Sequence, residues 1–256
     1  MMIAEKRRQE ILKLIEKHGA IRISNLGKTF NVTDMTIRRD IDYLSNKGLV
    51  NRVHGGAVSD REGNLQLATT FLKRNQENRP EKERIANKAQ SYVSENSTII
   101  IDGGSTNEFF ARALDPNINL KIITHALNIA WILSENENYE LFVPGGRLNR
   151  LTMTFSGREV ETMYEEINAD ILFICASGLS IEKGLTDPMW LDTSIKKAMI
   201  GSSSRVILLI DSHKFDLISS RTFADLKDID VVITDSNLDQ ELNDKYLAAG
   251  VKLVVA

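Results

Sequence analysis

The chain has 256 residues, of which 42% are hydrophobic and 26% charged, the composition of an ordinary globular protein. Its apolar runs fall well short of the roughly 20 residues that a membrane-spanning helix needs, and its first residues do not resemble a secretory signal. The single cysteine excludes an intrachain disulfide, so we expect a cytoplasmic protein with no membrane partner.

Charge is unevenly distributed along the chain. Residues 1–58 contain 11 Lys or Arg against 6 Asp or Glu, a net charge of +5, whereas residues 59–256 contain 21 against 29, a net charge of −8. A basic segment attached to an acidic remainder favours double-stranded DNA as the partner of the basic segment alone. A small helical bundle without a partner would not need this asymmetry.

Two helices are predicted at the start of the basic segment. Residues 4–17 form an amphipathic pattern whose apolar face contains Ile11, Leu12 and Ile15. Residues 23–30 predict a second, shorter helix, followed by a turn.

A third helix is predicted to begin after Thr33, whose hydroxyl can accept a hydrogen bond from a free backbone N–H. Ile37, Ile41 and Leu44 then follow at i, i+4 and i+7, the spacing of one buried stripe. Gly48 comes where a C-terminal glycine is expected. The three helices predict an all-α helix-turn-helix in which this helix reads DNA.

A β-wing is predicted directly after the third helix, because residues 49–53 alternate like a strand and Gly55-Gly56 permits a tight turn. Arg39 is the residue we expect to contact guanine, since arginine matches the guanine edge. The expected recognition residues are Thr33, Met35, Thr36, Arg38 and Arg39. Phosphate or minor-groove contacts are expected from Arg22, Lys28, Arg52 and His54.

The sequence after the basic segment changes character twice. Residues 58–70 are polar and without sustained periodicity, which predicts a linker. Residues 71–79 predict a helix that stops before Pro80, and residues 81–94 predict another. The expected domains are therefore a winged helix-turn-helix at 1–57, a linker and connecting helix at 58–80, and a larger domain at 81–256.

The larger domain contains short, uninterrupted apolar runs separated by helical segments. Such runs are typical of parallel strands that are covered on both faces, so we expect an α/β, Rossmann-like open sheet. The predicted strands are 98–102, 121–124, 140–144, 170–176, 205–211, 231–235 and 252–256.

Polar and glycine clusters follow several of these strands, and ligands of open α/β sheets bind at the carboxyl ends of strands. The run Asp102–Asn107 could bind a phosphate through glycine backbone, hydroxyls and a helix N-terminus, or it could be a simple glycine turn. Five clusters at one edge would form a crevice suited to a phosphorylated sugar or polyol. The expected effector residues are Asp102, Gly103, Gly104, Ser105, Thr106, His125, Asn128, Gly145, Gly146, Arg147, Lys196 and Lys214.

Other conspicuous residues receive a structural interpretation. Cys175 is expected to be a buried strand residue, and Phe109, Phe110, Met199 and Trp131 are expected in the core. Trp190 could line a ligand site or an oligomer contact. The four histidines lack metal-ligand spacing, so we expect neither a metal site nor a cofactor.

Over almost its whole length the chain resembles the DeoR family of bacterial transcription regulators. In the basic segment, the resemblance rests on the motifs E-K-R-R-Q-E-I-L (5–12), M-T-I-R-R-D-I (35–41) and V-H-G-G-A (53–57). In the larger domain, it rests on the motifs I-D-G-G-S-T (101–106), I-T-H-A-L-N-I-A (123–130), G-G-R-L (145–148), G-L-T (184–186), I-K-K-A-M-I (195–200) and D-S-H-K-F (211–215).

This resemblance implies a repressor of sugar or polyol catabolism that is controlled by a phosphorylated sugar. It also implies a sensor domain similar to ribose-5-phosphate isomerase and glucosamine-6-phosphate deaminase. Those enzymes carry a proton-transferring carboxylate where this chain has residues 176–180, A-S-G-L-S, without an acid. The position of His125 is commonly Asn in the family, so the effector preference could differ.

The sequence thus predicts a sequence-specific repressor that is at least a dimer or tetramer and that binds operator DNA and a phosphorylated sugar or polyol. An isomerase or deaminase fused to a DNA-binding head is the main alternative, and the missing carboxylate counts against it. An activator or architectural DNA binder with a vestigial pocket is a third possibility.

Overall fold

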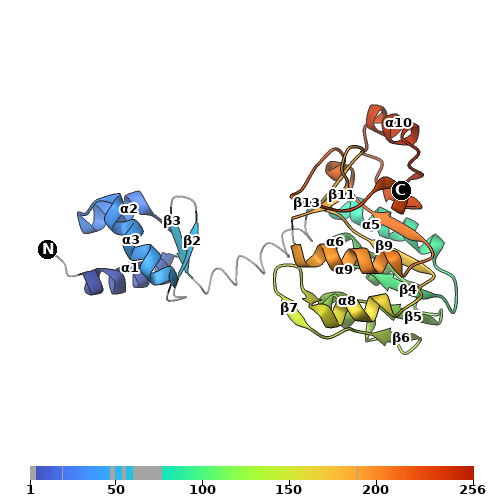
Figure 1. The fold of residues 1–256 in the computed structure, drawn as a ribbon, viewed down its shortest axis with the longest axis horizontal. Coiled ribbons are helices and arrows are strands. Elements are labelled where there is room, and N and C mark those ends of the chain that lie inside the picture. Colours follow the sequence, from blue (N-terminus) through green and yellow to red (C-terminus); the bar gives the residue numbers. More distant parts are fainter. Residues whose placement is uncertain (1–3, 19, 47–49, 54–55, 60–76, 189) are drawn as a thin grey trace. The chain divides into compact units, whose positions relative to one another are not determined.

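The computed structural model describes residues 4–18, 20–46, 50–53, 56–59, 77–188 and 190–256. The chain divides into two compact units, residues 1–70 and 71–256 (Figure 1). Among the described helices, none combines the length and apolar character needed to cross a membrane.

The first unit contains the three expected helices: α1 (Ala4–His18), α2 (Ile23–Phe30) and α3 (Asp34–Asn46). A three-stranded antiparallel sheet in the order β1-β3-β2 accompanies them, formed by β1 (Ala20–Arg22), β2 (Val50–Val53) and β3 (Gly56–Ser59). Strand β1 was not predicted. The hairpin β2–β3 follows α3 where the wing was expected, and its turn at 54–55 lies outside the described residues.

The predicted stripe of α3 forms the centre of the first core. Ile37 and Ile41 are fully buried against Ile11 and Ile15 of α1. The predicted cap is also confirmed, because the backbone N–H of Thr36 donates to Thr33 Oγ1 at 3.3 Å. Burial on α3 therefore leaves the opposite face of the helix free of core contacts.

Asp40 of α3 binds two arginines of α1. Its side chain is buried, and its carboxylate oxygens lie 2.6 Å from Arg7 Nε and 2.8 Å from Arg8 Nε. A buried carboxylate is stable only when it is paired, so this interaction fixes α1 against the helix that follows the turn.

In the second unit, all seven predicted strands form a single parallel sheet (Figure 1). Its order is β15-β14-β12-β9-β4-β5-β6, so the chain moves outward from β4 in one direction and from β9 in the other. The strands are β4 (Thr98–Ile101), β5 (Leu120–Ile123), β6 (Tyr139–Phe142), β9 (Ile171–Ile174), β12 (Val206–Leu209), β14 (Val231–Thr234) and β15 (Leu253–Val255).

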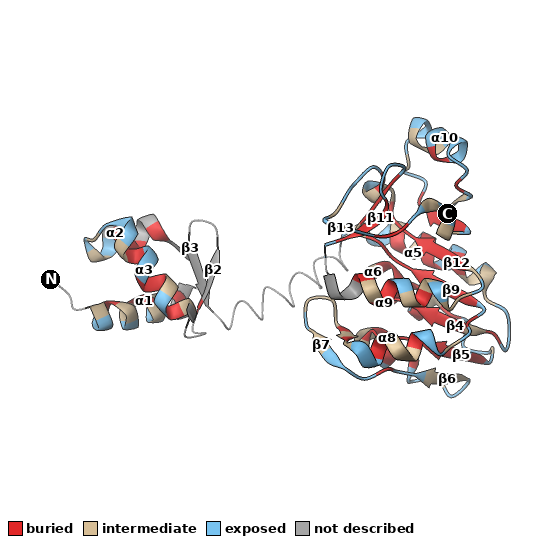
Figure 2. Cartoon of the chain, viewed as in Figure 1, coloured by how far each residue is buried: buried red, intermediate tan, exposed pale blue. Residues whose placement is uncertain are grey.

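Helices cover both faces of this sheet, which is why its strands lack polar alternation (Figure 2). Along β4, Ile99 and Ile101 belong to one apolar cluster and Ile100 to the other. The first face carries α5 (Arg79–Ala89), α6 (Ser105–Ala113) and α7 (Leu127–Leu133). The second carries α8 (Arg158–Glu165), α9 (Trp190–Gly201) and α10 (Gln240–Ala248).

Two small antiparallel sheets stand beside the large one. One has the order β10-β11-β13 and consists of β10 (Gly178–Ser180), β11 (Gly184–Asp187) and β13 (Arg221–Ala224). The other pairs β7 (Arg147–Asn149) with β8 (Thr154–Ser156). Short 3₁₀ turns occur at Gln90–Tyr92, Ser212–Lys214 and Leu226–Asp228.

Two details of the sequence-based prediction need correction. Pro80 does not stop a helix but lies in the first turn of α5, where its missing N–H breaks no helical hydrogen bond. The helix expected at 81–94 thus runs from 79 to 89 and continues as a 3₁₀ turn, while residues 71–76 of the preceding predicted helix lie outside the described residues.

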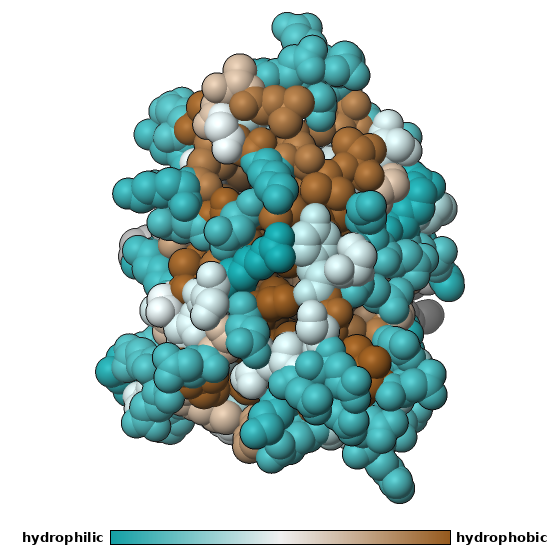
Figure 3. All heavy atoms as spheres, turned by 90° about the vertical axis from the view of Figure 1, so that its right-hand side faces the viewer, coloured by the Kyte–Doolittle hydropathy of each residue, from teal (hydrophilic) through white to brown (hydrophobic). Residues whose placement is uncertain are grey.

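Trp131 was expected in the core and is instead 72% exposed on α7, whereas Phe110 and Met199 are buried as predicted. Helix α7 covers the β6 edge of the sheet, where Phe142 is also exposed. At the opposite edge Leu247 and Val255 are about half exposed, and apolar surface gathers at the level of α10 and the chain end (Figure 3). Trp190 belongs to α9, but its side chain is not among those described.

We expect Asp40→Asn to destabilise the first unit by about 2–4 kcal/mol, because two guanidinium groups would lose their buried partner. Glu10→Gln is the matched control, since the Glu10–Lys13 pair is exposed and worth about 0.2–1 kcal/mol. Urea unfolding of the full chain, followed by circular dichroism, measures both. Equal losses in the two variants would contradict the role of Asp40.

Candidate functional site

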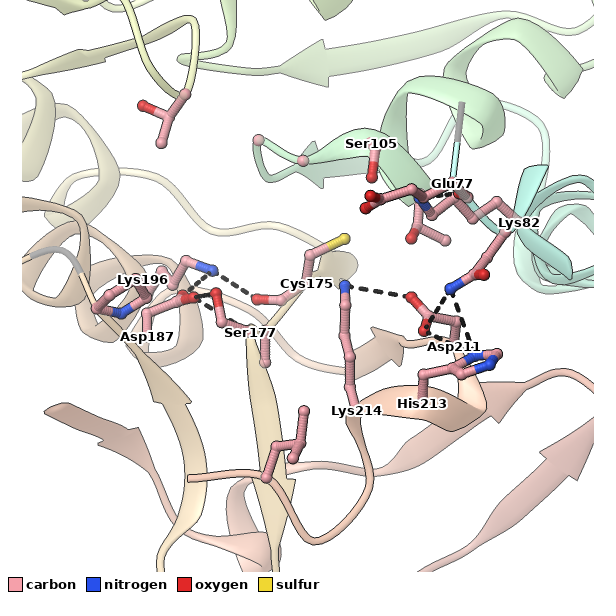
Figure 4. A pocket seen from close by; sticks show the side chains of 18 of the residues that line it. Glu77, Lys82, Ser105, Cys175, Ser177, Asp187, Lys196, Asp211, His213 and Lys214 are labelled. Atoms are coloured by element: carbon pink, nitrogen blue, oxygen red, sulfur yellow. Dashed lines mark hydrogen bonds and ion pairs between the residues drawn. The ribbon is translucent and has the colours of Figure 1, made fainter. Parts of the chain in front are cut away.

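A cavity of about 410 Å³ opens where β4, β9 and β12 end (Figure 4). Strand order reverses between β4 and β9, and crevices at such switch points bind ligands in open α/β sheets. Six predicted effector residues line it: Gly103, Gly104, Ser105, Thr106, Lys196 and Lys214. The lining also includes Glu77, Asn78, Lys82, Cys175, Ser177, Asp187, Asp211, His213 and Leu217.

The loop between β4 and α6 brings backbone close to the cavity wall. Gly104 has φ of +128°, and a Cβ at this position would lie 3.2 Å from the Cβ of Cys175. A Cβ on Gly103 would lie 2.5 Å from Thr154 Cγ2. Both positions therefore favour glycine, which lets the chain turn tightly into α6.

The N-terminus of α6 faces the cavity without a side-chain cap. Thr106, in its first turn, is fully buried, and its Oγ1 has no hydrogen-bond partner. A buried hydroxyl without a partner is costly, and free N–H groups at a helix start attract anions. This end of the cavity can therefore bind an oxyanion.

Lys196 of α9 is buried between two carboxylates. Its Nζ lies 2.7 Å from Asp187 Oδ2 and 3.0 Å from Asp102 Oδ2, and it donates to the carbonyl oxygen of Cys175. Burial alone would lower the pKa of Lys196, but the two carboxylates outweigh it and raise the pKa above its ordinary value. Lys196 thus remains charged at neutral pH, with its charge matched by protein groups.

Two further lysines lie on the other side of Cys175 (Figure 4). Lys214 reaches Asp211 Oδ2 at 3.3 Å, and Lys82 Nζ donates to the carbonyl oxygen of Glu77 at 2.7 Å. Lys82 is only 3% exposed. Its pKa is lowered mainly by burial and further by the charge of Lys214, so the two amines are close enough to repel each other. An anion placed near both would relieve that repulsion.

Cys175 lies at the floor of the cavity, just after β9, and it is buried as predicted. Burial, with the nearby charge of Asp102, raises the pKa of the Cys175 thiol to about 11. The thiol is therefore protonated at neutral pH and is a poor nucleophile.

Asp102 and His125 lie behind the cavity rather than in its lining. Asp102 accepts hydrogen bonds from the backbone N–H groups of Gly103 and Cys175. His125 Nδ1 lies 3.1 Å from the hydroxyl of Tyr164, and burial lowers the pKa of His125 to about 4, so the imidazole is neutral at pH 7. These two residues support the wall that the ligand would meet.

Four other predicted effector residues lie away from the described cavity lining. Asn128 donates to Glu108 Oε2 at 2.8 Å. Gly145, Gly146 and Arg147 follow β6, which is two strands away from β4. The five strand-end clusters therefore do not all meet in one crevice.

Sequence reasoning missed Lys82 and Asn78. Lys82 shares the buried face of α5 with Ile85, Ala86 and Ala89. A lysine at an apolar position of an amphipathic helix was the detectable signal, since lysine is almost never fully buried without a partner. Asn78 gave no comparable pattern before the structure placed it beside Asp211.

The two aspartates of the cavity lining, Asp187 and Asp211, already have protein partners. Asp187 accepts from the backbone N–H and hydroxyl of Ser177 through Oδ1, and its Oδ2 faces Lys196. A general base needs an oxygen that can reach the substrate proton. This arrangement supports ligand binding rather than proton transfer.

In the first unit, α3 presents the predicted recognition residues on its outer surface. Met35 is 61% exposed, and Thr33, Arg38 and Arg39 are exposed beside a half-buried Thr36. Of the predicted phosphate contacts, His54 lies outside the described residues, as do the side chains of Arg22, Lys28 and Arg52.

Two family models match the chain. The DeoR-like helix-turn-helix domain matches residues 7–62, and the DeoR C terminal sensor domain matches residues 77–236. The chain is 31% identical to the HTH-type transcriptional regulator GolR of Listeria innocua, over 100% of both chains.

Another relative is the lactose phosphotransferase system repressor of Streptococcus mutans, which is 31% identical over 94% of this chain and 96% of that protein. Among solved structures, ribose 5-phosphate isomerase A of Methanocaldococcus jannaschii matches with a TM-score of 0.40 and 18% identity, over 54% of this chain and 55% of that one. Both family models and full-length relatives describe regulators, and the chain belongs to the DeoR family of transcriptional regulators.

Proposed function

We propose that this regulator represses a sugar or polyol catabolic operon and responds to a phosphorylated sugar bound in the cavity of the second unit. The observation that carries the proposal is the buried, unpartnered hydroxyl of Thr106 at the uncapped start of α6. The name of the Streptococcus mutans relative, a lactose phosphotransferase system repressor, supports sugar control and repression.

The cavity has the size and charge pattern for such an effector. Its volume of about 410 Å³ falls in the ordinary range for small-molecule sites. The phosphate would bind Thr106 and the N-terminus of α6, in the cavity that Lys82 and Lys214 also line. Charge-assisted hydrogen bonds of this kind are about twice as strong as neutral ones.

The rest of the cavity lining suits the hydroxylated carbon chain or ring of a sugar or polyol. Ser177 and Asp187 offer a hydroxyl and a carboxylate, while Leu217 adds an apolar surface. Binding sites for small polar ligands commonly combine a few placed polar groups with apolar contact. Lys196 would act here by holding Asp187 in place rather than by binding the phosphate.

We also propose that α3 reads the operator in the major groove. Arg38 and Arg39 combine positive charge with exposure, and Met35 offers an apolar contact for a thymine methyl group. The β2–β3 hairpin would then act as the wing. Since operators mirror the symmetry of their regulators, a homo-oligomer with repeated half-sites remains our prediction.

Arg39→Ala should relax base preference at one position and weaken operator binding by about 1–3 kcal/mol, which is roughly 5- to 150-fold. Lys13→Ala removes the same charge from the exposed side of α1 and should leave the consensus unchanged. Selection from random duplexes, followed by anisotropy at one fixed salt concentration, measures both. An unaltered consensus in Arg39→Ala would remove Arg39 from the reading residues.

A panel of phosphorylated sugars and polyols should contain at least one compound that raises the melting temperature of the chain. At 100 times its Kd, such a compound adds about 2.7 kcal/mol to the free energy of unfolding. Thr106→Val should reduce affinity for that compound about tenfold, since a hydrogen bond to a charged group is lost.

Thr234→Val is the matched control, because Thr234 is another fully buried threonine whose Oγ1 has no partner, and it does not belong to the cavity lining. Both variants should remain folded, since neither loses a hydrogen bond within the protein. A flat panel, or an equal shift in Thr106→Val and the wild type, would contradict the proposed effector site.

A further inference from the structure

Glu77 contributes a carboxylate to a cavity that is otherwise suited to an anion. It is an exposed residue in the cavity lining, and its carbonyl oxygen accepts from Lys82 Nζ at 2.7 Å. Ser105, in the first turn of α6, lines the same cavity (Figure 4). The charge of Glu77 also favours the protonated form of Lys82, though less than the charge of Asp211 does, and so raises the pKa of Lys82 against the effect of burial.

A carboxylate in the lining of this cavity competes for the partners that a phosphate would use. Negative groups are stabilised at helix N-termini, and lysines bind carboxylates and phosphates alike. Two anions cannot share such a small site without strong repulsion. We propose that Glu77 is a built-in occupant of the anion site at the start of α6, and that the anionic group of the effector displaces it. This inference rests on the proposed function.

Displacing Glu77 would affect the residues that immediately precede α5. The next residue, Asn78, has φ of +52° and precedes the first turn of α5. Its amide Nδ2 lies 3.4 Å from Asp211 Oδ1 and 3.3 Å from His213 Nδ1. Asp211 in turn pairs with Lys214, which the effector would attract. Effector binding thus changes two contacts that hold residues 77 and 78.

The test compares Glu77→Gln with Glu81→Gln in the full chain. Glu81 lies in the first turn of α5, carries the same charge, and contacts Arg84 and Asn237 instead of lining the cavity. Binding of inorganic phosphate is titrated by ³¹P NMR at constant ionic strength, and circular dichroism verifies the fold. We expect Glu77→Gln to bind phosphate about 5- to 10-fold more tightly than the wild type and Glu81→Gln to bind as the wild type does.

Each outcome is decisive. Equal or weaker binding by Glu77→Gln, or the same gain in Glu81→Gln, would overturn the assignment of Glu77 while leaving the proposed function intact. Failure of all three proteins to bind phosphate would remove the anion site itself, and with it the proposed function. In the wild type, phosphate should also change amide hydrogen exchange in the peptide containing residues 77–82, and Glu77→Gln should show that change before phosphate is added. No change in either protein would overturn the displacement.

Discussion

The buried ammonium group of Lys196 ties α9 to the ends of two neighbouring strands of the large sheet and to the small sheet that contains β11. Asp102 follows β4, the carbonyl oxygen of Cys175 follows β9, and Asp187 ends β11. Burying three charges is costly unless each finds its partners, and here one cation is matched to two carboxylates with further hydrogen bonds. The cavity therefore has a rigid wall because its own charges are satisfied.

That internal matching determines which charges face a ligand. Lys196 is matched by two carboxylates and is buried between them, whereas Lys214 has Asp211 as its carboxylate partner and lines the cavity together with Lys82 and the start of α6. In our proposal, the positive charge that faces the phosphate therefore comes from Lys82, Lys214 and the backbone at the start of α6 rather than from Lys196. The neutral His125 and the protonated Cys175 add shape rather than charge.

The fold was more accessible from the sequence than the site. All seven strands of the large sheet were predicted, because a strand covered on both faces must be apolar throughout, and the stripe of α3 was predicted because Ile37, Ile41 and Leu44 must meet one core. Trp131 was placed wrongly because periodicity identifies a helix face but not whether the chain covers it. Which strand-end clusters meet depends on strand order, and that order follows from packing between distant segments rather than from any local pattern.

Control by an effector requires two states that bind it with different affinity. In our proposal, a carboxylate inside the anion site supplies such a difference locally. The site would accept the effector only in the fraction of molecules in which Glu77 has left, so the apparent affinity would fall by that fraction. The same step links binding to the backbone at Asn78, whose left-handed conformation is kept by contacts with Asp211 and His213. A sensor built in this way needs no movement of the large sheet. The fixed wall at Lys196 and the displaceable side chain of Glu77 then have different roles. If the wall moved together with Glu77, displacement of the side chain would leave its backbone unchanged. Because the wall stays in place, displacement of the side chain changes the backbone at residues 77 and 78.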